Sequence, residues 1–314
     1  MRVLTFTSVC GSSACDACGG PDMKGCPFCV SKMTGYEQLP PVDSFDMRGF
    51  NKAVKLAAIG GCTTWLISSK GEATLYPKAI TDQLKHHYSW DSLGGPFPLI
   101  ELQTNALQIG KLARLGGDWI DRQPLQTRHI AEWHRLGLNT IAISCVGINH
   151  EANSEVYHPE YPSLELTVRF LHDLGFSVRL CVMMLKKKGY VYTPDHVQEV
   201  IEWCKRNRVE QLTIRPIRRP IRVDKTPEGE FVIKHGLDAN DMAPVSDWVN
   251  QTGNALLTIS HGSNVTTIYD VKGQNIAVSD CLTVAADTDT IRTLIFWADG
   301  RITYDWQFPG AILA

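Results

Sequence analysis

The feature that most constrains the fold is a regular alternation of short apolar runs and helix-length amphipathic stretches over the first 216 residues. The apolar runs, rich in β-branched residues, lie at 3–9, 62–68, 98–104, 139–145, 178–185 and 211–216. Stretches with helical spacing follow the first five runs, at 50–60, 78–88, 106–116, 163–175 and 196–207. Continuous apolar strands separated by helices are typical of a parallel sheet whose faces are covered. The sequence therefore predicts an α/β fold of six β/α units.

Six such units fit either a parallel barrel, complete or partial, or an open doubly wound sheet, and periodicity does not separate the two. In both architectures ligands bind at the carboxyl ends of the strands. After a stretch rich in Pro and Arg, the remainder changes to short strand signals joined by Gly- and Asp-containing turns, of which 271–274 and 298–301 are expected to be hairpin connections. We therefore predict a β/α part over 1–235 and a β-rich extension over 236–314.

Composition excludes several classes of function. The 314 residues are 44% hydrophobic, which is enough apolar side chain to bury a full core, and the formal net charge is -2. No global positive field therefore recruits nucleic acid or an anionic membrane. No apolar run approaches the roughly 20 residues that span a bilayer, and the amino-terminal residues lack the basic and apolar regions of a secretory signal. We expect a cytoplasmic protein without a membrane partner.

Cysteine is distributed unevenly. Five of the ten cysteines fall within the first 30 residues, directly after the first predicted strand: Cys10, Cys15, Cys18, Cys26 and Cys29. Clustered thiols in a protein of this class more often bind metal or do chemistry than form disulfides. Two CxxC pairs suit a tetrahedral zinc site, whereas three thiolates around an open iron make a reactive [4Fe–4S] site. The cysteine count leaves both open, but a loop at the carboxyl end of the first strand favours chemistry.

The sequence Cys26-Pro-Phe-Cys29 resembles the closing half of the cluster motif of radical S-adenosylmethionine (radical SAM) enzymes. Phe28 occupies the place of the aromatic residue that commonly precedes the last cysteine of that motif. The usual pattern has three residues between its first two cysteines, and that place is taken here by Asp22. This chain therefore departs from the motif in its first half.

Three cysteine registers are compatible with the resemblance. The resemblance favours Cys10, Cys26 and Cys29 as cluster ligands, with an inserted loop after Cys10, because family members usually place the first cysteine at the strand end. Cys18 is the alternative first ligand. A register of Cys10, Cys15 and Cys18 lacks the aromatic residue before its last cysteine.

Two further segments resemble family motifs. Gly71 and Glu72, after the second predicted strand, resemble the GGE motif, with Lys70 in place of its first glycine. Glycine lets the backbone approach a ligand, and a carboxylate accepts hydrogen bonds from a methionine ammonium group; an ordinary charged turn is the other interpretation. Thr104 and Asn105, ending the third strand, resemble a TNG-type ending, and either could instead cap the following helix.

Ser144, at the end of the fourth strand, resembles positions where the family contacts ribose or the methionyl carboxylate; a buried hydroxyl that is satisfied within the protein is the other interpretation. Arg215, at the end of the sixth strand, could pair a carboxylate or phosphate bidentately. It opens a basic segment that continues to Lys225. The simpler interpretation of that segment is a solvated loop. The more specific interpretation is that it binds a nucleotide or RNA substrate.

The resemblance implies a partial parallel (β/α)6, TIM-like barrel whose carboxyl-terminal strands cap the mouth. It also implies a [4Fe–4S] cluster that cleaves S-adenosylmethionine to a 5′-deoxyadenosyl radical, which abstracts hydrogen from a substrate that the sequence does not identify. A flavodoxin- or ferredoxin-type protein would donate the electron. The alternative is a zinc-stapled β/α protein that binds nucleic acid or a protein partner without catalysis.

Overall fold

The computed structural model describes most of the chain. The described residues are 2–10, 25–29, 45–69, 71–90, 95–116, 125–218, 226–261, 264–278, 290–306 and 310–314. Cys15, Cys18 and Lys70 therefore lie outside the described residues.

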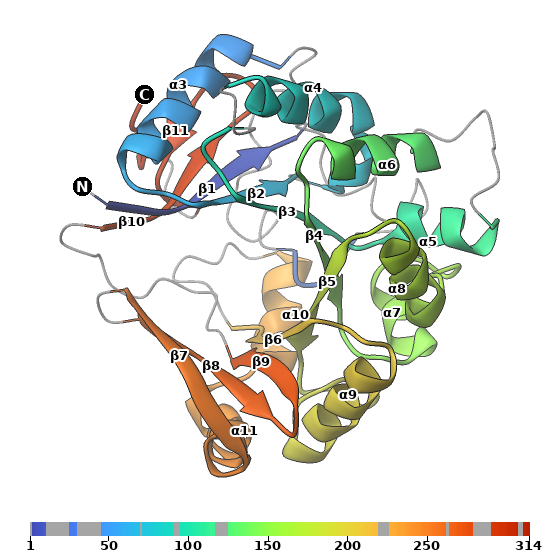
Figure 1. The fold of residues 1–314 in the computed structure, drawn as a ribbon. Helices are drawn as coiled ribbons and strands as arrows, with labels where there is room; N and C mark the ends of the chain where they lie inside the picture. The colour runs from blue at the N-terminus through green and yellow to red at the C-terminus, as the bar shows by residue number, and fades with distance from the viewer. Residues whose placement is uncertain are drawn as a thin grey trace.

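Six parallel strands form the centre of one curved sheet, in chain order (Figure 1). They are β1 (Arg2–Val9), β2 (Thr64–Ser68), β3 (Leu99–Thr104), β4 (Thr140–Cys145), β5 (Ser177–Met184) and β6 (Gln211–Pro216). All six coincide with the predicted strands to within two residues at each end. The prediction of a partial parallel barrel with a β-rich extension is confirmed.

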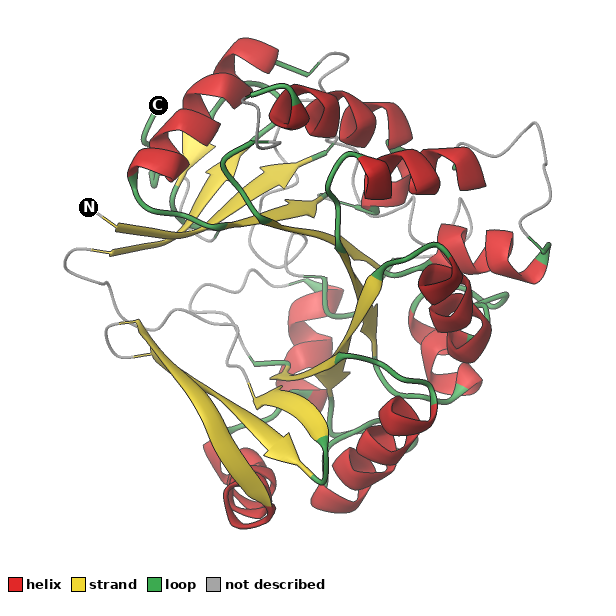
Figure 2. Ribbon diagram, in the orientation of Figure 1, coloured by secondary structure: helices red, strands yellow, loops and turns green. Residues whose placement is uncertain are grey.

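Helices connect successive strands and line the outer, convex side of the curve (Figure 2). They are α3 (Met47–Ile59), α4 (Pro77–Tyr88), α5 (Leu107–Arg114), α6 (Thr127–Arg135), α7 (His150–Val156), α8 (Leu164–Asp173) and α9 (Pro194–Arg206), with a short 3-10 turn η2 (Ala73–Leu75) after β2. Side-chain caps fix several helix starts: Asn149, Ser163 and Thr193 each accept a backbone N–H of the first turn. None of the described helices is long and apolar enough to cross a membrane.

The carboxyl-terminal third extends the sheet at both edges. It contains α10 (Pro227–His235), α11 (Ala239–Thr252), β7 (Gly253–His261), β8 (Asn264–Val271), β9 (Gln274–Val278), β10 (Thr290–Phe296) and β11 (Ile302–Thr303). β9 pairs in parallel with β6 and is followed outward by antiparallel β8 and β7, whereas β10 pairs in parallel with β1. The strands after 235 thus join the same sheet, and the domain boundary there stays a prediction.

The turn between β8 and β9 shows how local sequence fixes this extension. Lys272 and Gly273 both have left-handed backbone conformations, with φ of 53° and 83°. Two successive left-handed residues match the twist of an antiparallel hairpin, and glycine adopts that conformation at little cost. The expected hairpin at 271–274 is confirmed.

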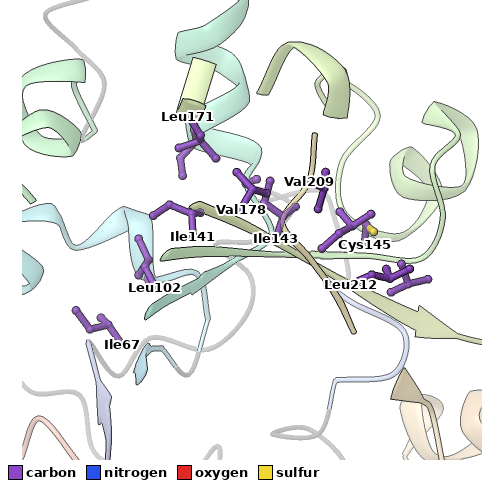
Figure 3. Packing of buried hydrophobic residues seen from close by; sticks show 14 of the residues in the cluster. Ile67, Leu102, Ile141, Ile143, Cys145, Leu171, Val178, Val209 and Leu212 are labelled. Atoms are coloured by element: carbon purple, nitrogen blue, oxygen red, sulfur yellow. The ribbon is translucent and has the colours of Figure 1, made fainter. Parts of the chain in front are cut away.

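The core lies between the sheet and the outer helices. Ile67, Leu102, Ile141 and Ile143 are fully buried on successive strands, and Leu171 of α8 packs toward them (Figure 3). Because side chains alternate across a strand, the residues between these point to the concave side of the sheet. The two faces of the sheet therefore have separate roles.

Candidate active site

The concave side carries a band of half-buried side chains near the carboxyl ends of the parallel strands. We call Ser68, Gln103, Ser144, Met183 and Arg215, one from each of β2 to β6, the concave rim. Each alternates with a fully buried, helix-facing neighbour. Ser144 and Arg215 were predicted site residues, and the structure places both on this rim.

Beneath the rim lies an ion pair that the sequence analysis missed. Glu101 of β3 is 3% exposed and pairs with Arg179 of β5, across the intervening strand β4. Gln103 Nε2 also donates to Glu101 Oε1, at 3.4 Å. A charged pair in the middle of a barrel interior is unusual, because such interiors are ordinarily filled by apolar side chains. The available signal was a single charge inside each apolar strand, in LIELQT and SVRLCVMM.

Cys181 lies next to this ion pair. It is 3% exposed, and charged and polar side chains surround it. Burial raises the pKa of the Cys181 thiol, while nearby Arg215 and a hydrogen bond with Thr213 act in the opposite direction. The concave interior of β5 and β6 is therefore a polar, partly buried surface with arginines of two strands on it.

Residues 71–76 and 104–107 form a second polar region, the β2–β3 corner. Glu72 is 3% exposed and follows β2, and its carboxylate accepts hydrogen bonds from Thr74, from Thr104 at the end of β3 and from the backbone N–H of Asn105. Gly71 is half-buried, and its N–H donates to the Ser69 hydroxyl at 3.2 Å. The structure thus brings together four predicted site residues, Gly71, Glu72, Thr104 and Asn105, at one corner of the barrel mouth.

The start of α5 tests the capping interpretation of Thr104 and Asn105. The N-cap residue is Ala106, which is left-handed with φ 61°. Thr104 Oγ1 accepts the Ala106 N–H and Asn105 Oδ1 accepts the Leu107 N–H, both at 2.9 Å. Asn105 and Thr104 lie one and two residues before the N-cap position. Their side chains therefore stabilise the turn that leads into α5.

The cysteines of the motif fall in two different environments. Cys10, directly after β1, is completely buried, and Gln83 of α4 donates a hydrogen bond to its Sγ at 3.0 Å. Burial raises the pKa of the Cys10 thiol to about 12. Cys26 and Cys29 are half-buried on one turn, closed by a 3.1 Å hydrogen bond from Cys29 N–H to Cys26 O.

Phe28 anchors that turn. It is 9% exposed, and its ring lies 6.5 Å from the ring of Phe231 on α10. The turn therefore packs against an element that follows β6 in the chain, while Cys10 packs beneath α4. Within the described ranges, no three His, Cys, Asp or Glu side chains gather in a way that could hold a metal ion. Two soft thiols on one turn fit part of an iron–sulfur or zinc site, and the role of Cys10 as a ligand stays a prediction.

The structure is similar to solved radical SAM enzymes. One is Streptococcus suis SuiB bound to S-adenosylmethionine, with TM-score 0.57 and 12% identity over 98% of this chain and 61% of that one. Another is HydG, a maturase of the [FeFe]-hydrogenase, with TM-score 0.53 and 10% identity over 80% of this chain and 50% of that one. The fold is that of the radical SAM enzymes. The chain spans less than two thirds of the length of either protein.

No protein-family model matches the sequence, and no curated protein matches it. Within the radical SAM fold, the predicted motif residues keep the order that the resemblance implies. The cysteine turn follows β1, Glu72 follows β2, Asn105 follows β3, and Ser144 and Arg215 lie near the ends of β4 and β6.

Proposed function

We propose that this chain is a radical SAM enzyme that binds a [4Fe–4S] cluster and S-adenosylmethionine at the mouth of its partial barrel. When bound, the cluster supplies the electron that cleaves S-adenosylmethionine to a 5′-deoxyadenosyl radical, which abstracts hydrogen from a substrate. The observation that carries the proposal is the half-exposed thiol pair of the turn 26–29, which follows β1 in a barrel of this fold. A flavodoxin- or ferredoxin-type protein is the proposed electron donor.

The cluster ligands are Cys26, Cys29 and a third thiolate. Cys10 would have to leave the core and give up its hydrogen bond from Gln83 to join the turn. We therefore assign the third position to Cys18, the alternative from the sequence. After anaerobic reconstitution, Cys18→Ala is expected to lose the cluster absorbance and Cys10→Ala to keep it. The opposite pattern restores Cys10 as the ligand.

This chain's own residues would position the cofactor and the substrate. Gly71, Thr104, Asn105 and Ser144 lie at the carboxyl ends of β2 to β4 and would contact S-adenosylmethionine, as Arg215 of β6 would from the opposite side of the concave rim. Beneath the rim, the Glu101 carboxylate of the Glu101–Arg179 pair is shielded from bulk water, while Arg179 stays partly exposed. A site of this kind protects a reactive intermediate from side reactions.

The test is formation of 5′-deoxyadenosine. Purified protein is reconstituted with iron and sulfide without oxygen, reduced, and incubated with S-adenosylmethionine. The wild type is expected to be brown and to release 5′-deoxyadenosine, whereas Cys26→Ala and Cys29→Ala are expected to be colourless and inactive. Cys204→Ala, at a buried position on α9, is the matched control and is expected to keep both properties.

Zinc-stapled binding without catalysis is the second candidate, because the CxxC spacing of Cys26 and Cys29 also suits zinc. A colourless protein that retains tightly bound zinc under the same conditions would favour it over the first.

For the substrate we propose an anionic compound, with a nucleotide or RNA as the class to test first. Arg215 on the concave rim and Arg218 beyond the end of β6 carry positive charge at the mouth. A phosphate-bearing ligand is expected to raise the melting temperature of the wild type more than that of Arg215→Met. Equal increases in the melting temperatures of the two proteins would show that Arg215 does not contribute to recognition of the substrate.

A further inference from the structure

Glu72 supplies the carboxylate of the β2–β3 corner, and four hydrogen bonds reach it. From the described residues, its Oε1 accepts Thr74 N–H at 3.0 Å, Thr74 Oγ1 at 2.7 Å and Thr104 Oγ1 at 2.6 Å, and its Oε2 accepts Asn105 N–H at 2.8 Å. An ionised carboxylate offers about four lone-pair sites. Three of these four donors lie on Oε1 and one on Oε2, so the protein itself uses most of the hydrogen-bonding capacity of Glu72, and within the described residues one site on Oε2 stays open.

The bonds of Glu72 hold a strained turn. Ala106 is a buried, left-handed residue with φ 61° and ψ 8°, a conformation that costs energy for any residue with a Cβ. Thr104 Oγ1 accepts the Ala106 N–H at 2.9 Å and donates its own proton to Glu72. The Tyr161 hydroxyl also donates to the Asn105 carbonyl, at 2.9 Å. The conformation of residues 104–106 therefore depends on the buried carboxylate.

The turn fixes one polar group that the described residues leave unpaired. Asn105 is 6% exposed, and its Oδ1 accepts the Leu107 N–H. Because the Leu107 N–H requires an acceptor, this bond assigns the oxygen of the Asn105 amide, and the NH2 group points away from the Leu107 N–H. Asn105 Nδ2 is buried and has no hydrogen-bond partner among the described residues. Buried donors in proteins nearly always meet an acceptor.

We propose that Glu72 is a positioning residue, and that the group it presents to the ligand is the Asn105 amide, which donates to an oxygen of S-adenosylmethionine. This inference rests on the proposed function for the identity of the ligand. In this proposal the Glu72 carboxylate stabilises the turn, and the Asn105 amide binds the ligand. The arrangement differs from the one the sequence resemblance implies, in which the carboxylate itself receives the methionine ammonium group.

The experiment measures melting temperature and the Kd for S-adenosylmethionine, by equilibrium dialysis, in reconstituted protein. Glu72→Gln sets an amide N–H against the Asn105 N–H, so the melting temperature is expected to fall by about 5 °C or more, with weaker binding. Asn105→Ser keeps an oxygen for the Leu107 N–H but removes the amide. Its Kd is expected to rise about tenfold with the melting temperature nearly unchanged. Asn149→Ser, at the cap of α7, is the matched control and should leave the Kd unchanged.

Each result decides a part of the proposal. Weaker binding by Glu72→Gln at an unchanged melting temperature would show that the carboxylate itself contacts the ligand, and would overturn the positioning role. An unchanged Kd in Asn105→Ser would overturn the binding role of the amide. If Glu72→Gln does not fold, Thr104→Val removes one bond to the carboxylate, and an unchanged melting temperature there contradicts the proposal. A wild type that does not bind S-adenosylmethionine overturns the proposed function and the role of the amide, while the melting temperatures still judge Glu72.

Discussion

The two faces of the central sheet use the same strands for different purposes. On the convex face, Leu102 and Ile143 are fully buried against the outer helices. One residue away on the concave face, Gln103 and Ser144 are half-exposed. The period-two alternation of a strand separates the two sets completely. The stability of the barrel is therefore expected to depend on one face, and binding and chemistry on the other.

The largest expected difference between the environments is in thiol reactivity. Cys10 joins the convex core, and burial raises the pKa of its thiol from the ordinary value of 9.0 to about 12. The thiolate is the species that iodoacetamide attacks, so Cys10 should be alkylated at least about a thousandfold more slowly than a free cysteine. Mass spectrometry of native protein without its cluster, sampled over time, measures this rate. Modification of Cys10 as fast as that of half-exposed Cys26 would contradict its burial.

Adjacent residues of β4 provide the next contrast. Ile143→Ala removes a fully buried side chain and should lower the free energy of unfolding by about 2–5 kcal/mol. Ser144→Ala, on the opposite face, should change it by less than about 0.5 kcal/mol. Urea denaturation of both variants compares them directly. Similar losses in the two would mean that the concave face also carries the stability of the strand.

Variants of the Glu101–Arg179 pair test whether a buried charge in the concave interior is tolerated only next to a partner of opposite charge. Arg179→Met leaves a buried carboxylate without its partner and should cost about 1–3 kcal/mol, less than for a fully buried pair because Arg179 reaches solvent. Glu101→Gln combined with Arg179→Met should recover most of that loss. Denaturant unfolding of the single and double variants checks this. A double variant no more stable than the single one would show that the two charges are not coupled.

A small effect is also expected at Ala106. Glycine adopts the left-handed conformation without the cost that alanine carries, but it loses buried methyl surface and gains freedom in the unfolded chain. Ala106→Gly should therefore change the free energy of unfolding by about 1 kcal/mol or less, with binding of S-adenosylmethionine kept. Thermal unfolding and dialysis measure the two quantities. A large loss of stability would mean that the buried methyl group outweighs the backbone strain.

Much of the fold could be predicted because each strand is a short, mostly apolar run rich in β-branched residues. The run IAIS of β4, for example, has no other good interpretation in a chain of alternating elements. The helices α6, α7, α10 and α11 were not predicted, and α6 (TRHIAEWHR) is short with only Ile130 and Trp133 buried. α7 (HEANSEV) is short and polar, and α10 and α11 follow a Pro- and Arg-rich stretch with no clear helical stripe. Their starts are fixed by side-chain caps at Asn149, Thr226 and Asp238, which give weak signals without a strong apolar pattern.

The positions of the candidate site residues in the fold could be predicted from the sequence, but their contacts could not. Position after a strand placed Ser144, Arg215 and Glu72 at the barrel mouth, because carboxyl ends of parallel strands share an edge. Glu72 accepts a hydrogen bond from Thr104 of β3, and Glu101 pairs with Arg179 of β5, two strands away. Such pairs depend on register and strand order, which periodicity alone does not provide. A one-residue shift of register would move each of these side chains to the other face.

The most direct test of the account is the reaction of reduced, reconstituted protein with S-adenosylmethionine in the absence of oxygen. We expect a broad iron–sulfur absorbance near about 400 nm, and 5′-deoxyadenosine that disappears in Cys26→Ala. Protein that takes up no iron under these conditions, or that retains the cluster and forms 5′-deoxyadenosine without Cys26, would contradict it.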